Sequence, residues 1–184
     1  IVAYKKRALR EAIGYVPQDH FLFSTTVAGN IAFANADATM DEIYEAARLA
    51  NIHEDILQFT DGYNTIVGER GVSLSGGQKQ RISIARALMM KPELLILDDS
   101  LSAVDARTEE AILESLKKSR TDETTIITSH RLSAIAHAHQ IIVMNEGTII
   151  EKGTHEELME LKGMYYEMYQ LQQLENLVEK GRDV

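Results

Sequence analysis

Two short stretches of this sequence carry residue types that suit phosphate chemistry. The first is Leu74-Ser75-Gly76-Gly77-Gln78, which opens an amphipathic segment. Adjacent glycines let bare backbone amides approach an anion, and the positive end of a helix dipole favours negative charge at that place. Ser75, Gly76, Gly77 and Gln78 are therefore candidates for binding the phosphates of a nucleotide.

The second stretch is an apolar run, residues 94–97, that ends in the carboxylates Asp98 and Asp99. Carboxylate oxygens suit Mg²⁺, and a second carboxylate beside it can serve an attacking water. Asp98 could instead cap the turn after a strand. A carboxylate that follows four apolar residues is costly to bury without a cation or several donors, so we favour Mg²⁺, held through a bound water.

The surrounding elements predict an α/β fold. Residues 94–97 and 124–128 are typical of strands in a parallel sheet covered on both faces, and residues 109–118 predict a crossover helix between them. A short strand at residues 12–17 is halted by a proline, and helices are expected at 39–50, within 51–63 and at 78–90. Because ligands gather at the carboxyl ends of parallel strands, we expect Asp98, Asp99 and His130 at one edge of the sheet.

The C-terminal third is expected to add little chemistry, and its hairpin to serve as scaffold. Residues 141–150 are typical of a hairpin with its turn at Asn145-Glu146-Gly147. A capping box begins at Thr154, and helical apolar spacing continues to residue 179 with a break at Gly163.

In their order along the chain, these segments resemble the motifs of the ATP-binding-cassette (ABC) ATPases. Gln18 resembles the Q-loop residue, residues 74–78 the signature, 94–99 the Walker B strand, 102–105 the D-loop and His130 the H-loop. The resemblance covers residues 13–153. It implies a P-loop NTPase (RecA-like) parallel sheet core with an α-helical signature subdomain, and ATP and Mg²⁺ as cofactors.

The resemblance also implies roles for single residues. Gln18 and Asp98 would hold the metal; Asp99, His130 and Gln18 would serve catalysis; Ser75, Gly76, Gly77, Gln78 and Asp105 would bind nucleotide at a dimer interface. Each has a simpler alternative. Gln18 could be an ordinary loop amide, His130 a core histidine, and Asp105 the N-cap of the helix that follows, a role compatible with the interface.

The segment Gly68-Glu69-Arg70-Gly71 resembles the part of exporter-type cassettes that touches the coupling helices of the membrane domain. Glu69 and Arg70 could equally be solvated loop charges. With this segment, the resemblance implies an exporter, a second ABC ATPase domain and a transmembrane domain as partners, and a place at the cytoplasmic face of the cell membrane.

The sequence predicts one domain portion in four parts: 1–22 with a core strand and the Q-loop, 23–90 as helical subdomain with the signature, 91–160 as core, and 161–184 as helical tail. No GxxxxGK[ST] sequence occurs and the first residue is not Met. We therefore expect the later part of a larger protein, inactive by itself.

Composition agrees with this interpretation. A formal net charge of -9 gives no basic face for nucleic acid, and the absence of Cys excludes a disulfide framework. No apolar stretch approaches the roughly 18–20 residues of a bilayer helix. The transmembrane domain is therefore expected outside this chain.

Asp99 departs from the family pattern, which usually has Glu at this position. The shorter side chain predicts slow hydrolysis, because misplacing a catalytic group by about 1 Å can cost on the order of a hundredfold in rate. With a regular signature, the chain resembles the degenerate-site half of a heterodimer. The alternatives are that the backbone compensates and Asp99 is an active base, that the chain is a soluble ABC ATPase of translation or DNA maintenance, or that it is a non-catalytic dimerisation module.

Overall fold

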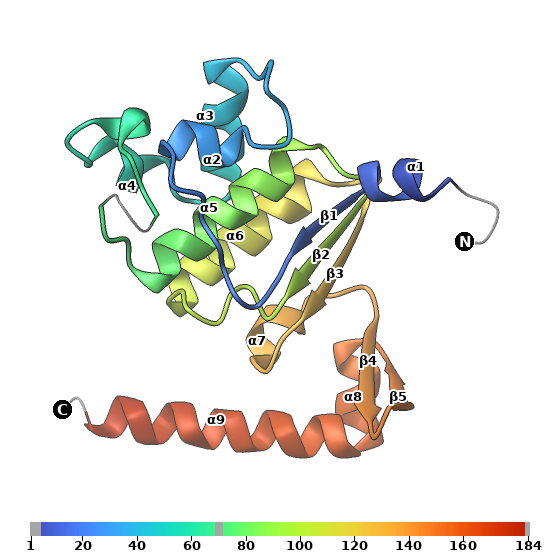
Figure 1. Ribbon diagram of the computed structural model, residues 1–184. Helices are drawn as coiled ribbons and strands as arrows, with labels where there is room; N and C mark the ends of the chain where they lie inside the picture. The colour runs from blue at the N-terminus through green and yellow to red at the C-terminus, as the bar shows by residue number, and fades with distance from the viewer. Residues whose placement is uncertain (1–4, 69–71, 183–184) are drawn as a thin grey trace. The chain divides into compact units, whose positions relative to one another are not determined.

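The computed structural model describes residues 5–68 and 72–182, which form two compact units that divide between Thr128 and Ser129. In order, the first contains α1 (Lys6–Glu11), β1 (Ile13–Val16), α2 (Val27–Ile31), α3 (Met40–Leu49), α4 (His53–Leu57), the 3-10 helix η1 (Gly62–Asn64), α5 (Gly76–Met89), β2 (Leu94–Asp98), α6 (Ala106–Ser119) and β3 (Thr124–Thr128) (Figure 1).

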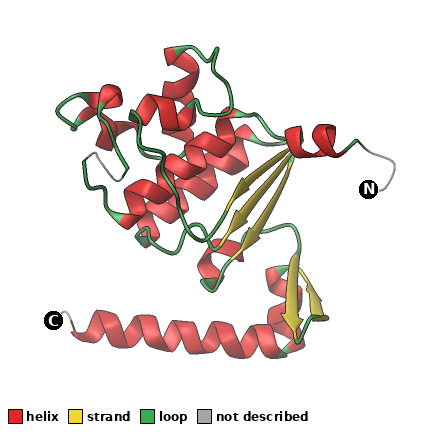
Figure 2. Ribbon diagram, in the orientation of Figure 1, coloured by secondary structure: helices red, strands yellow, loops and turns green. Residues whose placement is uncertain are grey.

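The three strands of the first unit form a parallel sheet in the order β1-β2-β3, which confirms the predicted α/β fold (Figure 2). The central strand pairs Tyr15 with Ile96 on one side and Asp98 with Thr128 on the other. Helix α6 makes the crossover from β2 to β3. The sheet register therefore brings the ends of β1, β2 and β3 together at the edge that carries Asp98.

Only one face of this sheet is buried. Leu95 and Leu97 have no exposed surface, whereas Tyr15 and Ile126, on the opposite face, are 54% and 46% exposed. Helices α5 and α6 lie on a single side of the strands (Figure 1). The expectation of a sheet covered on both faces is therefore wrong for the described residues, because alternate side chains of each strand point away from these helices.

The helical part contains α2 to α5. Helix α3 begins with the predicted capping box, in which Thr39 and Glu42 bond each other's backbone, and it buries Ile43, Ala46 and Ala47. These small and branched side chains let α3 pack closely against α5. The predicted helix at 39–50 and its inward face are thus confirmed.

Helix α5 begins at Gly76, two residues earlier than the sequence indicated. The reason is a second capping box: the Ser75 side chain accepts from the Gln78 backbone, and the Gln78 side chain accepts from the Ser75 backbone. Both glycines of the signature segment, residues 74–78, therefore lie in the first turn of the helix.

The second unit contains α7 (Leu132–Ile135), β4 (Ile141–Asn145), β5 (Thr148–Gly153), α8 (His155–Leu161) and α9 (Met164–Arg182). Strands β4 and β5 form the predicted hairpin, with positive φ at Glu146 and Gly147 as a two-residue primed turn requires. Its core gathers Leu132, Ile141, Leu158 and Tyr165. Among residues 5–68 and 72–182, no helix is both long and apolar enough to cross a membrane.

Candidate functional site

Asp98 is the last residue of β2 and its carboxylate accepts two side-chain hydrogen bonds. Thr128 Oγ1 donates to Oδ1 at 2.7 Å and the Tyr15 hydroxyl donates to Oδ2 at 3.0 Å. These bonds, that of Thr128 before that of Tyr15, hold the pKa of Asp98 below its ordinary value. Asp98 is therefore an anion at neutral pH, with both oxygens fixed in direction at the carboxyl end of the sheet.

Asp99 follows in a left-handed conformation, with φ 45°. Its backbone N–H donates to the carbonyl oxygen and to Oγ1 of Thr128, both at 3.0 Å. Its carboxylate accepts from Gln18 Nε2 at 3.2 Å. Asp tolerates this backbone conformation better than most residues do, so the turn that aims the carboxylate at Gln18 suits the residue found here.

The oxygen atoms at this edge of the sheet are suitable ligands for a magnesium ion. Asp98 offers carboxylate oxygens, and Gln18, which donates through Nε2, has its amide oxygen left to offer. No group of three or more His, Asp or Glu side chains that could hold a metal occurs in the described part of the chain. Mg²⁺ usually keeps several waters and is held by one or two carboxylates together with substrate phosphates, which matches so sparse a set of protein ligands.

The signature segment presents an exposed helix start. The capping box occupies the Ser75 and Gln78 backbone N–H groups at 3.0 and 3.2 Å, whereas the N–H groups of Gly76 and Gly77 lie in the first turn, where a helix offers them no partner. Ser75 and Gly76 are exposed. The first turn of α5 can therefore receive an anion on two backbone amides.

Residues 102–105 pack against this turn. A Cβ on Gly77 would lie 2.9 Å from the carbonyl oxygen of Ala103. The Ala103 N–H donates to Gln80 Oε1 at 3.0 Å, and the Gln80 side chain is fully buried. Sequence reasoning missed Gln80, because a polar residue on a helix carries no sign of what it contacts.

Asp105 is the N-cap of α6. Its Oδ1 accepts from the Thr108 N–H at 3.0 Å and its Oδ2 from the Thr108 hydroxyl at 2.7 Å. These two bonds lower the pKa of the Asp105 carboxyl, the hydroxyl contributing more. The capping alternative from the sequence is thus confirmed, and a nucleotide role for the exposed Asp105 stays a prediction.

His130 belongs to the second unit, where its side chain is exposed and its carbonyl oxygen accepts from Gln172 Nε2. Its expected place beside Asp98 and Asp99 stays a prediction. Glu69 and Arg70 lie outside the described residues.

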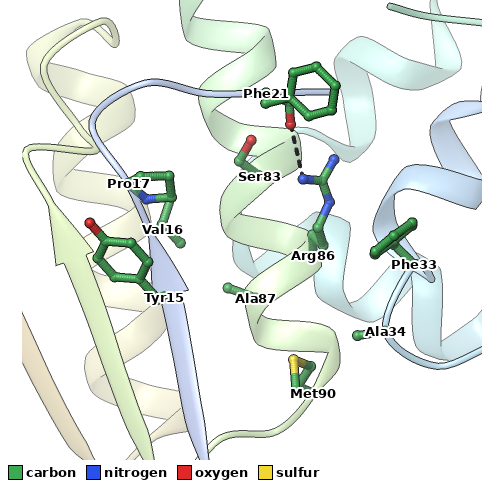
Figure 3. A pocket seen from close by; sticks show the side chains of 10 residues that line it. All are labelled: Tyr15, Val16, Pro17, Phe21, Phe33, Ala34, Ser83, Arg86, Ala87 and Met90. Atoms are coloured by element: carbon green, nitrogen blue, oxygen red, sulfur yellow. Dashed lines mark hydrogen bonds between the residues drawn. The ribbon is translucent and has the colours of Figure 1, made fainter. Parts of the chain in front are cut away.

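A pocket of about 240 Å³ lies beside the loop that carries Gln18 (Figure 3). Arg86 of α5 donates to the carbonyl oxygen of Phe21 at 3.0 Å and to Asn30 Oδ1 at 2.7 Å, so it ties this loop to both α5 and α2. Phe21 and Phe33 line the pocket and are 62% and 58% exposed. Exposed phenyl rings at a pocket mark a surface that another chain segment can cover.

Comparison with known proteins agrees with this geometry. The family described as "ABC transporter" matches residues 2–102. The chain is 56% identical over 94% of its length to the "Probable multidrug resistance ABC transporter ATP-binding/permease protein YheI" of Bacillus subtilis (strain 168) and 55% identical over 90% to the "Multidrug resistance-like ATP-binding protein MdlA" of Escherichia coli (strain K12). It spans 30% and 28% of their lengths.

A solved structure of a bacterial Atm1-family ABC exporter with ATP bound is 42% identical, with a TM-score of 0.89 over 94% of this chain and 30% of that chain. The chain therefore belongs to the ABC transporter family. Its sheet and helices have the ABC ATPase fold, of the P-loop NTPase type, which binds nucleotide.

The hydrogen bonds to Asp98 predict an ordered response of its pKa to substitution. Thr128→Val should raise that pKa toward its ordinary value by more than Tyr15→Phe does, because the Thr128 bond contributes more. Because the pKa of Asp98 is lowered in the folded state, its ionised carboxylate stabilises the fold at any pH above the ordinary pKa of Asp. This contribution is lost as the pH falls through the folded-state pKa. Carbon NMR titration of the carboxyl group would measure both shifts. A larger shift in Tyr15→Phe would contradict this order.

Proposed function

We propose that this chain supplies part of the ATP-hydrolysing engine of an ABC exporter, in which ATP binding and hydrolysis drive transport across a membrane. The observation that carries the proposal is the group of Gln18, Asp98 and Asp99 at the carboxyl end of β2, together with the open first turn of α5. Asp98 is held ionised, and Gln18 bonds directly to Asp99. The family membership and the similarity to exporters support it.

Each residue then has a chemical task. Asp98 and the Gln18 oxygen would hold Mg²⁺, which neutralises phosphate charge when bound. Asp99 would orient the attacking water or accept its proton, and the Gln18 N–H would keep that carboxylate in place. His130 would act on the γ-phosphate, as its resemblance to the H-loop residue implies.

In the proposed assembly, two cassettes enclose two ATP molecules head to tail. The signature segment of this chain, with Asp105, would complete a site on the partner, whereas Asp98, Asp99 and His130 would serve the chain's own site. Asp99 is one methylene shorter than Glu, so we propose that the chain's own site turns over slowly and that the partner is a different subunit.

We also propose a transmembrane domain as partner, at the cytoplasmic face of the cell membrane, with the exposed Phe21 and Phe33 beside the Gln18 loop as its contact. We propose that the functional parts of the chain are residues 1–22, 23–90, 91–160 and 161–184. Because no GxxxxGK[ST] sequence occurs in these 184 residues, we expect them to bind ATP weakly without the rest of a cassette. For these 184 residues alone, the alternative function is that of a non-catalytic dimerisation module.

The decisive substitution is Asp99→Glu. It should raise ATP turnover at the chain's own site by roughly tenfold or more, because the added methylene moves the carboxylate by about 1 Å toward the water. The measurement is ATP hydrolysis by the full-length pair in lipid, with the partner's catalytic carboxylate replaced so that only this site reports.

Asp99→Asn is the matched control for that experiment. It keeps the size of the side chain and its left-handed backbone, so it should not raise turnover. If Asp99→Glu leaves turnover unchanged and the wild-type site is already fast, the slow-site proposal fails and Asp99 is a working base.

A further inference from the structure

We propose that Asp55, on α4, is a positioning residue for the nucleotide-binding turn of α5, and that it acts through Gln78 on Ser75. The inference rests on the proposed function, because that turn is assigned there to nucleotide. Asp55 Oδ2 accepts from Arg81 Nη1 and Oδ1 from Arg81 Nη2, both at 2.9 Å. Asp55 Oδ1 also accepts from Gln78 Nε2 at 3.4 Å. The Asp55 carboxylate thus accepts hydrogen bonds from two side chains of α5.

Arg81 fixes the first turn of α5 to its surroundings. Its Nε donates to the Gly77 carbonyl oxygen at 3.3 Å and its Nη1 to the Asn51 carbonyl oxygen at 2.5 Å. The Arg81 side chain is only 12% exposed and that of Asp55 32%. A two-point guanidinium–carboxylate pair shielded in this way sets direction as well as distance, so α4 holds the signature turn in a defined orientation.

Asp55 also selects which end of the Gln78 amide faces Ser75. An ionised carboxylate can only accept hydrogen bonds, so the Gln78 NH₂ group must face Asp55. The Gln78 amide oxygen is then turned to the Ser75 N–H, from which it accepts at 3.0 Å. The opposite amide orientation would place two donors against each other at Ser75 and two acceptors at Asp55.

The consequence falls on the Ser75 hydroxyl. Its oxygen accepts from the Gln78 N–H at 3.2 Å, and its own hydrogen is left to donate to another group. Ser75 is exposed. The hydrogen bonds from Arg81 through Asp55 and Gln78 to Ser75 therefore prepare one hydroxyl donor for a phosphate, and Gln78 acts through Ser75 instead of binding the phosphate itself.

The test is Asp55→Asn in the full-length transporter with its partner. Asn keeps the shape of the side chain but can also donate, so the Gln78 amide is no longer held in one orientation. We expect kcat for ATP to fall roughly tenfold, less than the hundredfold that a displacement of about 1 Å brings, while the KM for ATP stays within about twofold because the nucleotide is bound mainly by the other cassette. In a Ser75→Ala background, Asp55→Asn should cause no further loss.

Tyr63→Phe is the matched control, because Tyr63 lies in η1 and contacts the start of α4. It removes the 2.7 Å hydrogen bond between the Tyr63 hydroxyl and His53 Nδ1, at the start of α4, without touching Asp55. Its turnover should stay within about twofold of wild type. Equal losses in Tyr63→Phe and Asp55→Asn, or additive losses of Asp55→Asn and Ser75→Ala, would overturn the positioning role.

Hydrogen exchange of the same full-length proteins distinguishes a failure of the positioning role of Asp55 from a failure of the proposed function. Asp55→Asn should raise exchange in peptides that cover residues 75–79, and Tyr63→Phe should not. If wild type hydrolyses no ATP but this exchange difference is seen, the proposed function fails and the positioning contact stands. If wild type is active and the exchange in residues 75–79 is unchanged, the positioning contact fails alone.

Discussion

ATP turnover by the assembled transporter should fall by about two orders of magnitude when Gly77 is replaced with Val. A Cβ at this position would lie 2.9 Å from the Ala103 carbonyl oxygen, a backbone atom that cannot rotate away, and 3.5 Å from Val104 Cγ1. Either the first turn of α5 or residues 102–105 must move. We also expect a loss of about 1–3 kcal/mol of folding free energy, as overpacking usually costs.

Gly76→Ala is the control for this prediction. A Cβ on Gly76 meets only the Ala103 Cβ at 3.5 Å, an ordinary contact. The thermal unfolding temperature should therefore change little in Gly76→Ala and fall in Gly77→Val. ATP turnover should fall less in Gly76→Ala than in Gly77→Val. Turnover in Gly77→Val within twofold of wild type would contradict the assignment of this turn to nucleotide.

Asp98→Asn should weaken Mg²⁺-dependent ATP retention at the chain's own site by about a hundredfold and remove the turnover that Asp99→Glu restores. The neutral amide loses the charge that attracts the metal. It also presents an NH₂ donor to one of the two hydroxyl donors, Thr128 or Tyr15, that now face carboxylate oxygens. Retention is measured as labelled nucleotide that stays bound with Mg²⁺ compared with EDTA.

Glu114→Gln is a suitable comparison for Asp98→Asn. It also neutralises a carboxylate, but one whose partner is the exposed Lys118 on the same helix. Exposed pairs of this kind contribute little to stability, so retention should match wild type. Mg²⁺-dependent retention that survives Asp98→Asn would exclude Asp98 as the metal ligand.

Much of the fold could be predicted because local signals and tertiary structure agree. The capping box at Thr39 and the spacing of Ile43, Ala46 and Ala47 define α3 in sequence and in structure alike. The apolar run before Asp98 predicted the central parallel strand, which β2 is. Sheet coverage could not be predicted, because an apolar strand does not say which helices lie on each of its faces.

The sequence predicted that Asp98 and Asp99 lie at the end of an apolar strand, but it did not predict which residues contact them. The signal for the second capping box was present as Ser75 followed three residues later by Gln78, but the adjacent glycines favoured an interpretation as phosphate seat alone. Tyr15 and Thr128 were missed as partners of Asp98, since their contact depends on the strand register. Asp55 lies 26 residues from Arg81 in sequence, and no local pattern connects the two.

The most direct measurement is ATP hydrolysis by the full-length protein in lipid, expressed alone and together with a second cassette subunit. The account predicts turnover only with that subunit, because this chain would complete a fast site there and keep a slow site of its own. Brisk turnover by the protein alone would contradict it and would make Asp99 the working base of a homodimer.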